Sequence, residues 1–344
     1  MQSVTTTGEV IRDVVPERWS RLRYRLLDLL IAYGTLIALI VLFAYFAFTT
    51  PYFFTADNLV NIGRFAAVGG ILAAAFTFGL IMSQVDLTIG PAISVAAITY
   101  AVLAERHALP VLLAVAITLG LSIVIGLANG VLVVDLGVNS FVGTLAMSLF
   151  LTGLGLVIPG TTSQSIFLTE HSASLHGFAT ARVLGLPVPL LLMVGVYLLF
   201  WVVLTFARLG AHVYATGGNP SAALRVGIPV SRLHRVAFLV TALACGVSAL
   251  LLVGQANYAS SAPGVGTGGT LTLTVLASVL IGGMDLTGGS GSVERTLVGV
   301  LLVAVLSNGL VLNGQDVYVQ YMVTGAVFVL AVLLSSVARK RKAR

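Results

Sequence analysis

Long stretches of Leu, Val, Ala and Ile, almost free of charged residues, follow one another along most of this chain. An α-helix needs about 20 predominantly apolar residues to cross a bilayer. Hydrophobic residues make up 58% of the 344 positions, charged residues only 9%, and the mean hydropathy is +1.05, which is far above that of a soluble domain. The sequence therefore predicts an integral membrane protein. The candidate spans are 29–50, 64–83, 91–105, 110–134, 139–158, 186–207, 236–254, 270–284, 293–313 and 318–338.

We expect an all-α fold, a polytopic bundle of about ten transmembrane helices with a range of about eight to ten. A transmembrane β-barrel would show segments of about ten residues with alternating polarity, whereas the apolar runs here are continuous. The segments 91–105 and 270–284 are short, so either could be a broken or re-entrant helix surrounded by protein. The first span follows a long charged segment and exceeds a signal-peptide core, so we expect it to remain attached.

The basic residues predict the orientation, because Lys and Arg concentrate in cytoplasmic loops. If the N-terminus is cytoplasmic and every span crosses, most of the 18 basic residues lie inside, and only Arg64, Arg106 and Arg182 lie outside. Both termini are then cytoplasmic, as residues 1–28 and a basic tail at 339–344. Residues 29–338 form the transmembrane domain, with a cytoplasmic loop at 208–235. Topology and contact with anionic lipids account for the positive charge, so no nucleic-acid partner is expected.

The loop at 208–235 contains the signals of one short helix. Asn219 is a favoured N-cap, Pro220 suits the first helical position, and Gly227 suits the left-handed residue after the end. They predict a helix at Ser221–Val226. A helix of two turns is marginal in water. We therefore expect it to dock on something, either the inner face of this protein or a groove of a partner.

Two aspartates end apolar spans in similar surroundings, Asp86 in Asp-Leu-Thr-Ile-Gly and Asp285 in Asp-Leu-Thr-Gly-Gly. An ionisable side chain at membrane depth is a functional candidate. The alternative is a structural role, in which the carboxylate caps the first turn of the next helix. Asn129-Gly130 also recurs as Asn308-Gly309, which indicates a weak internal repeat whose second half lacks one span. Either asparagine could form interhelical hydrogen bonds or line a polar translocation path.

Motifs that the chain lacks argue against an enzyme and against a transporter that hydrolyses ATP itself. A P-loop requires a lysine that reaches the phosphates, but Lys340 and Lys342 in the tail are the only lysines. The five histidines show no spacing typical of a metal site, and no Gly-x-Ser-x-Gly nucleophile motif is present. The single Cys245 lies in an apolar span and reads as a small core residue. No catalytic residue, metal or cofactor is therefore expected.

Four ordered motifs give the chain a specific likeness. They are Asp86-Leu87-Thr88-Ile89-Gly90, then 126–130 with Phe141-Val142-Gly143-Thr144-Leu145, then 214–219 continuing to Gly227-Ile228-Pro229-Val230, and last 281–283 with 289–293. Over about residues 55–338 the chain resembles the ribose-type permeases (simple sugar and autoinducer-2) of bacterial ABC importers. The resemblance implies a dimeric subunit of the bacterial inner membrane that pairs with a cytoplasmic ATPase and receives a sugar-like solute from an extracytoplasmic binding protein.

The resemblance also assigns the short helix a role. Ala222, Ala223 and Gly227 match the Glu-Ala-Ala-x-x-x-Gly core of the ATPase-docking loop, but Ser221 stands where that pattern has glutamate. Docking then lacks any salt bridge that the glutamate would make. The expected ATPase-coupling residues are Asn219, Ser221, Ala222, Ala223, Arg225 and Gly227. The expected translocation or gating residues are Asp86, Asn129, Asp285 and Asn308.

Other functions stay open from the sequence. An ion-coupled secondary transporter could use Asp86 and Asp285 and would need no companion protein. A membrane-embedded enzyme lacks a visible catalytic constellation. For the solute itself, Gln255, Asn257 and Tyr258 lie where the seventh predicted span ends, and they are candidates for direct contact.

Overall fold

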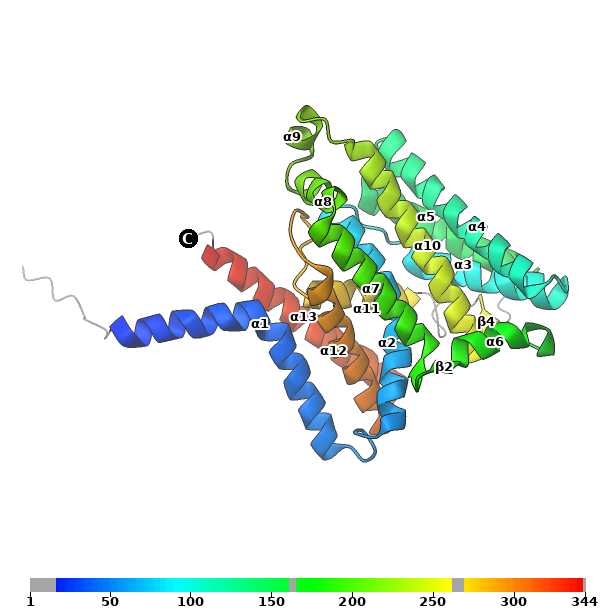
Figure 1. The fold of residues 1–344 in the computed structure, drawn as a ribbon, viewed down its shortest axis with the longest axis horizontal. Coiled ribbons are helices and arrows are strands. Elements are labelled where there is room, and N and C mark those ends of the chain that lie inside the picture. Colours follow the sequence, from blue (N-terminus) through cyan, green and yellow to red (C-terminus); the bar gives the residue numbers. More distant parts are fainter. Residues whose placement is uncertain (1–16, 161–164, 262–268, 343–344) are drawn as a thin grey trace, which may run out of the picture.

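The computed structural model describes residues 17–160, 165–261 and 269–342, and within these ranges the chain is mainly helical (Figure 1). The helices are α1 (Glu17–Thr49), α2 (Ala56–Ile81), α3 (Ile89–Ala101) with the π-helix η1 (Val102–Arg106), α4 (Val111–Gly130) with the π-helix η2 (Val131–Asp135), α5 (Ser140–Val157), η3 (Glu170–Ser172), α6 (Ala173–Thr180), α7 (Val188–Phe206), α8 (Arg208–Gly218), α9 (Pro220–Arg225), α10 (Val230–Ala256), α11 (Gly269–Ile281), α12 (Val293–Leu312) and α13 (Val317–Lys342). The strands are β1 (Ser165–Phe167), β2 (Arg182–Val183), β3 (Leu186–Pro187) and β4 (Tyr258–Ser260).

A helix occupies each of the ten predicted spans. Among the described residues, seven helical segments are long and apolar enough to cross a membrane, and three shorter apolar segments lie at Tyr33–Thr49, Leu271–Ile281 and Tyr318–Leu330. The third predicted span reaches full crossing length because η1 continues α3 to Arg106. The eighth is short, as expected, since α11 ends at Ile281.

At the centre of the bundle α10 packs on α2, α3 and α4, while α12 packs on α1, α2 and α11. Small residues let these helices approach closely. A Cβ at Gly126 of α4 would lie 2.9 Å from the Phe238 carbonyl oxygen of α10, and a Cβ at Gly299 of α12 would collide with the Ser278 carbonyl oxygen of α11. Cys245 is buried in α10, as predicted. The core is therefore built by backbone-to-backbone contact as well as by large side chains.

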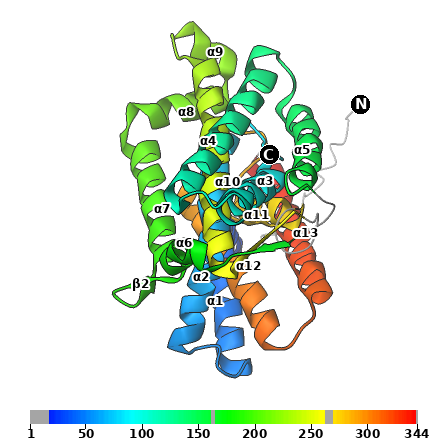
Figure 2. The ribbon, with the colours of Figure 1, turned by 90° about the vertical axis from the view of Figure 1, so that its right-hand side faces the viewer.

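The outer helices α4, α5 and α7 keep large apolar side chains exposed. Leu112 on α4 is 81% exposed, Leu149 on α5 is 72% exposed and Leu199 on α7 is 60% exposed. Figure 2 shows α4 in front of α10, with α5 to the right of both. Apolar patches of this extent are not tolerated in water, and a helix satisfies its own backbone in lipid. The fold is thus that of a helical membrane protein.

One end of the bundle, which we call the α6 end, is closed by short strands and by α6. β1 pairs antiparallel with β4, with Ile166 opposite Ala259, and β2 pairs with β3. All three arginines predicted to lie outside have local partners here. Arg64 donates to the Thr180 carbonyl, Arg106 donates to the Pro159 carbonyl and Arg182 lies 3.9 Å from Asp57.

The opposite end, the α9 end, carries α8, α9 and two loops, 82–88 between α2 and α3 and 282–292 between α11 and α12. α9 projects beyond the other helices in both views (Figures 1 and 2). The segment predicted as the loop 208–235 thus contains two helices and the first turns of α10, which begins at Val230 rather than near 236.

Candidate coupling and gating site

Asp86 lies in loop 82–88 at the centre of a buried polar network. Its Oδ1 accepts hydrogen bonds from the Thr88 backbone N at 2.9 Å and from the Thr88 hydroxyl at 2.5 Å. The same hydroxyl accepts a bond of 3.0 Å from Asn129 Nδ2 of α4. Asp86, Thr88 and Asn129 are 3%, 2% and 0% exposed. The structure therefore brings two predicted gating residues together through Thr88, which the sequence showed as part of the Asp-Leu-Thr motif but did not predict as a site residue.

Asp86 does not cap α3, contrary to one of the two expected roles. Its bonds go to Thr88, before the helix begins, and the N–H of Gly90 in the first turn is bound by the Thr272 hydroxyl of α11 at 2.8 Å. Asp285 behaves in the same way, because its Oδ1 accepts from the Thr287 N at 3.1 Å, whereas Ser292 caps α12 by accepting from the Arg295 N. Each aspartate holds its own Asp-Leu-Thr turn.

The two aspartate segments are also alike in the turn that precedes them. Ser83, at φ 61°, and Gly283, at φ 87°, end α2 and α11 in the left-handed conformation. In each case the next residue's N–H bonds five residues back, Gln84 to the Gly79 carbonyl and Met284 to the Val279 carbonyl, which is a Schellman motif. The two aspartate segments thus share the same local backbone turn.

The asparagine pair does not share this equivalence. Asn129 contacts the Asp86 loop at the α9 end, whereas Asn308 lies near the α6 end and exchanges two hydrogen bonds of 2.9 Å with Asn58 of α2. Asn58 also donates to the Phe53 carbonyl at 2.8 Å. The reciprocal amide pair holds α12 against α2, so the structure gives Asn308 the interhelical bond that was one of its two expected roles.

Two oxygens of the Asp86 network, Asp86 Oδ2 and Asn129 Oδ1, are buried and have no hydrogen-bond partner among the described residues. A buried polar network of this kind is sensitive to any shift of its members, because each unpaired atom costs free energy. The network joins α4 to the loop between α2 and α3. It can respond to movement of that loop, but it contains no nucleophile placed against a base.

The short helix α9 has the predicted signals in place. Asn219 Oδ1 accepts from the Ala222 N at 3.0 Å, Pro220 is the first helical residue, and Gly227 has φ +83°. The Ile228 N bonds to the Ala223 carbonyl at 3.0 Å and the Gly227 N to the Leu224 carbonyl at 3.1 Å, which closes the helix with a Schellman motif. Its boundaries are Pro220–Arg225 rather than Ser221–Val226.

Most of α9 faces outward. Ala223 is 3% exposed, whereas Leu224 is 57% exposed and Val226, just after the helix, is 76% exposed. Ser221, Ala222 and Arg225 are also exposed. Apolar side chains thus stand at the tip of the α9 end, outside the apolar belt of α4, α5 and α7.

The three candidates for solute contact lie at the end of α10. Asn257 has φ 59° and ends the helix, and its carbonyl accepts a bond of 2.9 Å from the Leu168 N. Tyr258 belongs to β4, and its ring centroid is 6.0 Å from that of Phe167. Gln255 Nε2 is buried without a hydrogen-bond partner in the described part of the chain. Asn257 and Tyr258 are therefore tied into the architecture of the α6 end.

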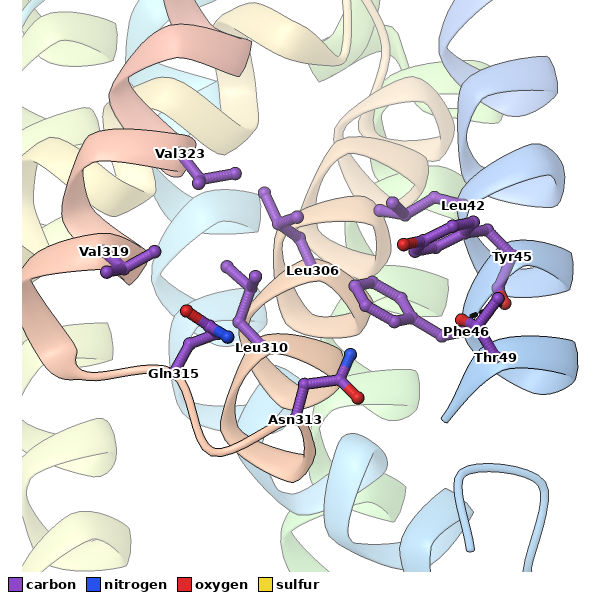
Figure 3. Close-up of a pocket in the computed structure, with 10 residues that line it drawn as sticks. All are labelled: Leu42, Tyr45, Phe46, Thr49, Leu306, Leu310, Asn313, Gln315, Val319 and Val323. Atoms are coloured by element: carbon purple, nitrogen blue, oxygen red, sulfur yellow. Dashed lines mark hydrogen bonds between the residues drawn. The ribbon is translucent and has the colours of Figure 1, made fainter. Parts of the chain in front are cut away.

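A groove of about 590 Å³ lies elsewhere, between α1, α12 and α13 (Figure 3). Apolar side chains such as Leu42, Phe46 and Leu306 line it, with Asn313 and Gln315 at the turn that joins α12 to α13. It contains none of the predicted site residues, so the candidate site remains the α9 end.

A bundle of apolar helices with a short projecting helix and a buried polar network at a helix break fits a membrane transport protein. Residues 58–332 match the family described as branched-chain amino acid transport system / permease component, and the chain belongs to this family. It is a transport permease rather than an enzyme.

Curated relatives cover most of the chain. It is 36% identical over 304 residues to the ribose import permease protein RbsC of Escherichia coli strain K12, covering 88% of this chain and 92% of that protein. It is 28% identical over 309 residues to the D-allose transport system permease protein AlsC of the same strain, covering 90% and 92%. It is 32% identical over 275 residues to the autoinducer 2 import system permease protein LsrD of E. coli O9:H4, covering 79% and 82%. No solved structure matches the chain.

Proposed function

We propose that this chain is the permease subunit of an ATP-driven importer in the bacterial inner membrane, and that a separate cytoplasmic ATPase drives it through α9. The observation that carries this proposal is the exposed α9 itself. Six helical residues, capped at Asn219 and closed at Gly227, are too few to be stable alone. Only Ala223 among them is buried, so a partner's groove is the better candidate for the docking surface than this protein's own surface.

The α9 end is the cytoplasmic side in this proposal. Arg208, Arg225, Arg232 and Arg235 lie on α8, α9 and the first turns of α10, and cytoplasmic ends of membrane helices are rich in such residues. Arg235 also pairs with Asp135 of η2, which ties α10 to the end of α4. Both chain termini are then cytoplasmic, and loop 282–292 lies on the same side.

The cargo is a monosaccharide or a sugar-like molecule. The relatives named for ribose, D-allose and autoinducer 2 support this class, since each covers about four fifths of the chain or more. We further propose an extracytoplasmic solute-binding protein and a second permease copy as partners. Ion-coupled transport through Asp86 and Asp285 is not favoured, because those relatives are import permeases and each aspartate is bound to its own turn.

The role of α9 is tested by Gly227→Val in cells that lack their own copy of the gene. Gly227 is at φ +83° with open space around its Cβ position. Valine there destabilises the end of α9 through backbone strain of about 1–2 kcal/mol, without a steric clash. We expect uptake of radiolabelled ribose, allose or another sugar of the class to fall to background, with a normal amount of chain in the membrane.

Gly314→Val is the matched control, because Gly314 has φ +68°, open space and a place in the turn at the α6 end. It should transport normally. Normal uptake by the Gly227 variant, or equal loss in both variants, would contradict a docking role for α9.

A further inference from the structure

The α9 end also contains a junction between α8 and the two loops that carry Asp86 and Asp285, 82–88 and 282–292. The docking role proposed for α9 does not account for this junction. Asn219 is at once the last cap of α8 and the first cap of α9, so no flexible linker separates the two helices. A displacement of α9 is therefore delivered directly to the end of α8, at Gly217 and Gly218.

That end of α8 touches the last residue of α2 and loop 282–292 with its backbone. A Cβ at Gly217 would collide with the Ile81 carbonyl oxygen of α2 and would lie 2.7 Å from the Gly289 nitrogen in loop 282–292. A Cβ at Gly289 would lie 2.9 Å from Gly218 Cα. The Tyr214 hydroxyl of α8 also donates to the Gly291 carbonyl at 2.9 Å. Contacts between backbones, unlike contacts between flexible side chains, leave little slack.

The loops are bound to each other as well. The Gly289 N donates to the Ile81 carbonyl at 2.7 Å, and the Ser83 hydroxyl donates to the Thr287 carbonyl at 2.6 Å. Gly288, at φ +77°, lets Ser83 approach, since a Cβ there would collide with Ser83 Oγ. One of the joined loops contains Asp86 and Thr88, which bond to Asn129 of α4, and the other leads through Ser292 into α12.

We propose that Gly217 and loops 82–88 and 282–292 form a relay that passes movement of α9 to two helix pairs, α2 with α3 and α11 with α12, at the same time. This inference rests on the proposed function, because it needs an ATPase that moves α9. Gly217, Ser83 and Tyr214 are positioning residues in it: they contact no ATPase and no solute but connect the docking helix to the gating network.

Adjacent glycines provide the test, since Gly218 has nothing within 4 Å of its Cβ position. Gly217→Ala and Gly218→Ala are expressed in cells lacking the native gene, and we measure the amount of chain in the membrane, the ATPase subunit that co-purifies, ATP hydrolysis by that complex and uptake of the labelled sugar. For Gly217→Ala we expect wild-type co-purification and hydrolysis but uptake lower by about tenfold. Gly218→Ala should match the wild type in all four.

If Gly217→Ala does not accumulate in the membrane, the relay is tested by Ser83→Ala and Tyr214→Phe instead. Each of these removes one hydrogen bond of the junction and introduces no clash. Both should keep the ATPase subunit and lose uptake several-fold. Normal uptake by these two variants, and by Gly217→Ala if it reaches the membrane, would overturn the relay. The movement of α9 would then have to pass through α10 instead. Loss of the ATPase subunit from Gly217→Ala would also overturn the relay, since the junction would then serve only to keep α9 in place for docking. If the wild-type chain itself shows no ATP-dependent uptake, the proposed function fails.

Discussion

At the scale of single residues, Thr88 connects the groups that the sequence presented separately. Its hydroxyl donates to Asp86 and accepts from Asn129, so one side chain links loop 82–88 to α4. Asp86 without this bond would be a buried carboxylate with fewer donors, and buried charges without partners are costly. Asp285, on the corresponding turn, is only half-buried, so its carboxylate loses less solvation and depends less on hydrogen bonds from the protein.

Replacing Thr88 by valine keeps the shape of the side chain and removes the bridge. We expect the free energy of unfolding to fall by about 2 kcal/mol, because two buried groups lose a partner. Thr99→Val on α3 is the control, since the Thr99 hydroxyl is buried with no hydrogen-bond partner within the described ranges. Thermal unfolding in detergent should show a lower midpoint for the Thr88 variant alone. Equal midpoints for the two variants would contradict the bridge.

At the scale of elements, α9 depends on its caps more than on its length. Asn219 supplies the bond to the Ala222 N, and the closing Schellman motif supplies the other end. A helix with one buried side chain gains little from packing, so each cap is a large fraction of its stability.

Asn219→Ala should therefore unwind α9 with a loss of about 1 kcal/mol from the cap. The measurement is the amount of ATPase subunit that co-purifies with the chain, which we expect to fall. Asn139→Ala is matched to it, because Asn139 caps α5 by accepting from the Phe141 N and Val142 N. The Asn139 variant should retain the subunit, and a loss common to both variants would argue against docking by α9.

At the scale of the whole molecule, the sequence predicted what depends on neighbours along the chain. The apolar spans locate ten helices to within a few residues, apart from the starts of α1, α2 and α10. Asn219, Pro220 and Gly227 locate α9, because spans and caps are local patterns. Contacts between distant segments were not predictable in this way. Asn308 meets Asn58 across 250 positions, and Gly217 meets Ile81 and Gly289 through the packing of three elements. The glycine pairs 217–218 and 288–289 were the visible signal for that junction.

In the mechanism that we propose, energy enters this permease from a separate ATPase, by contact at the α9 end. The most direct test is accumulation of radiolabelled sugar by liposomes that contain only the purified chain, with proton and sodium gradients imposed and ATP supplied on both sides. We expect no accumulation above the external concentration and no ATP hydrolysis. Accumulation by the chain alone would contradict it.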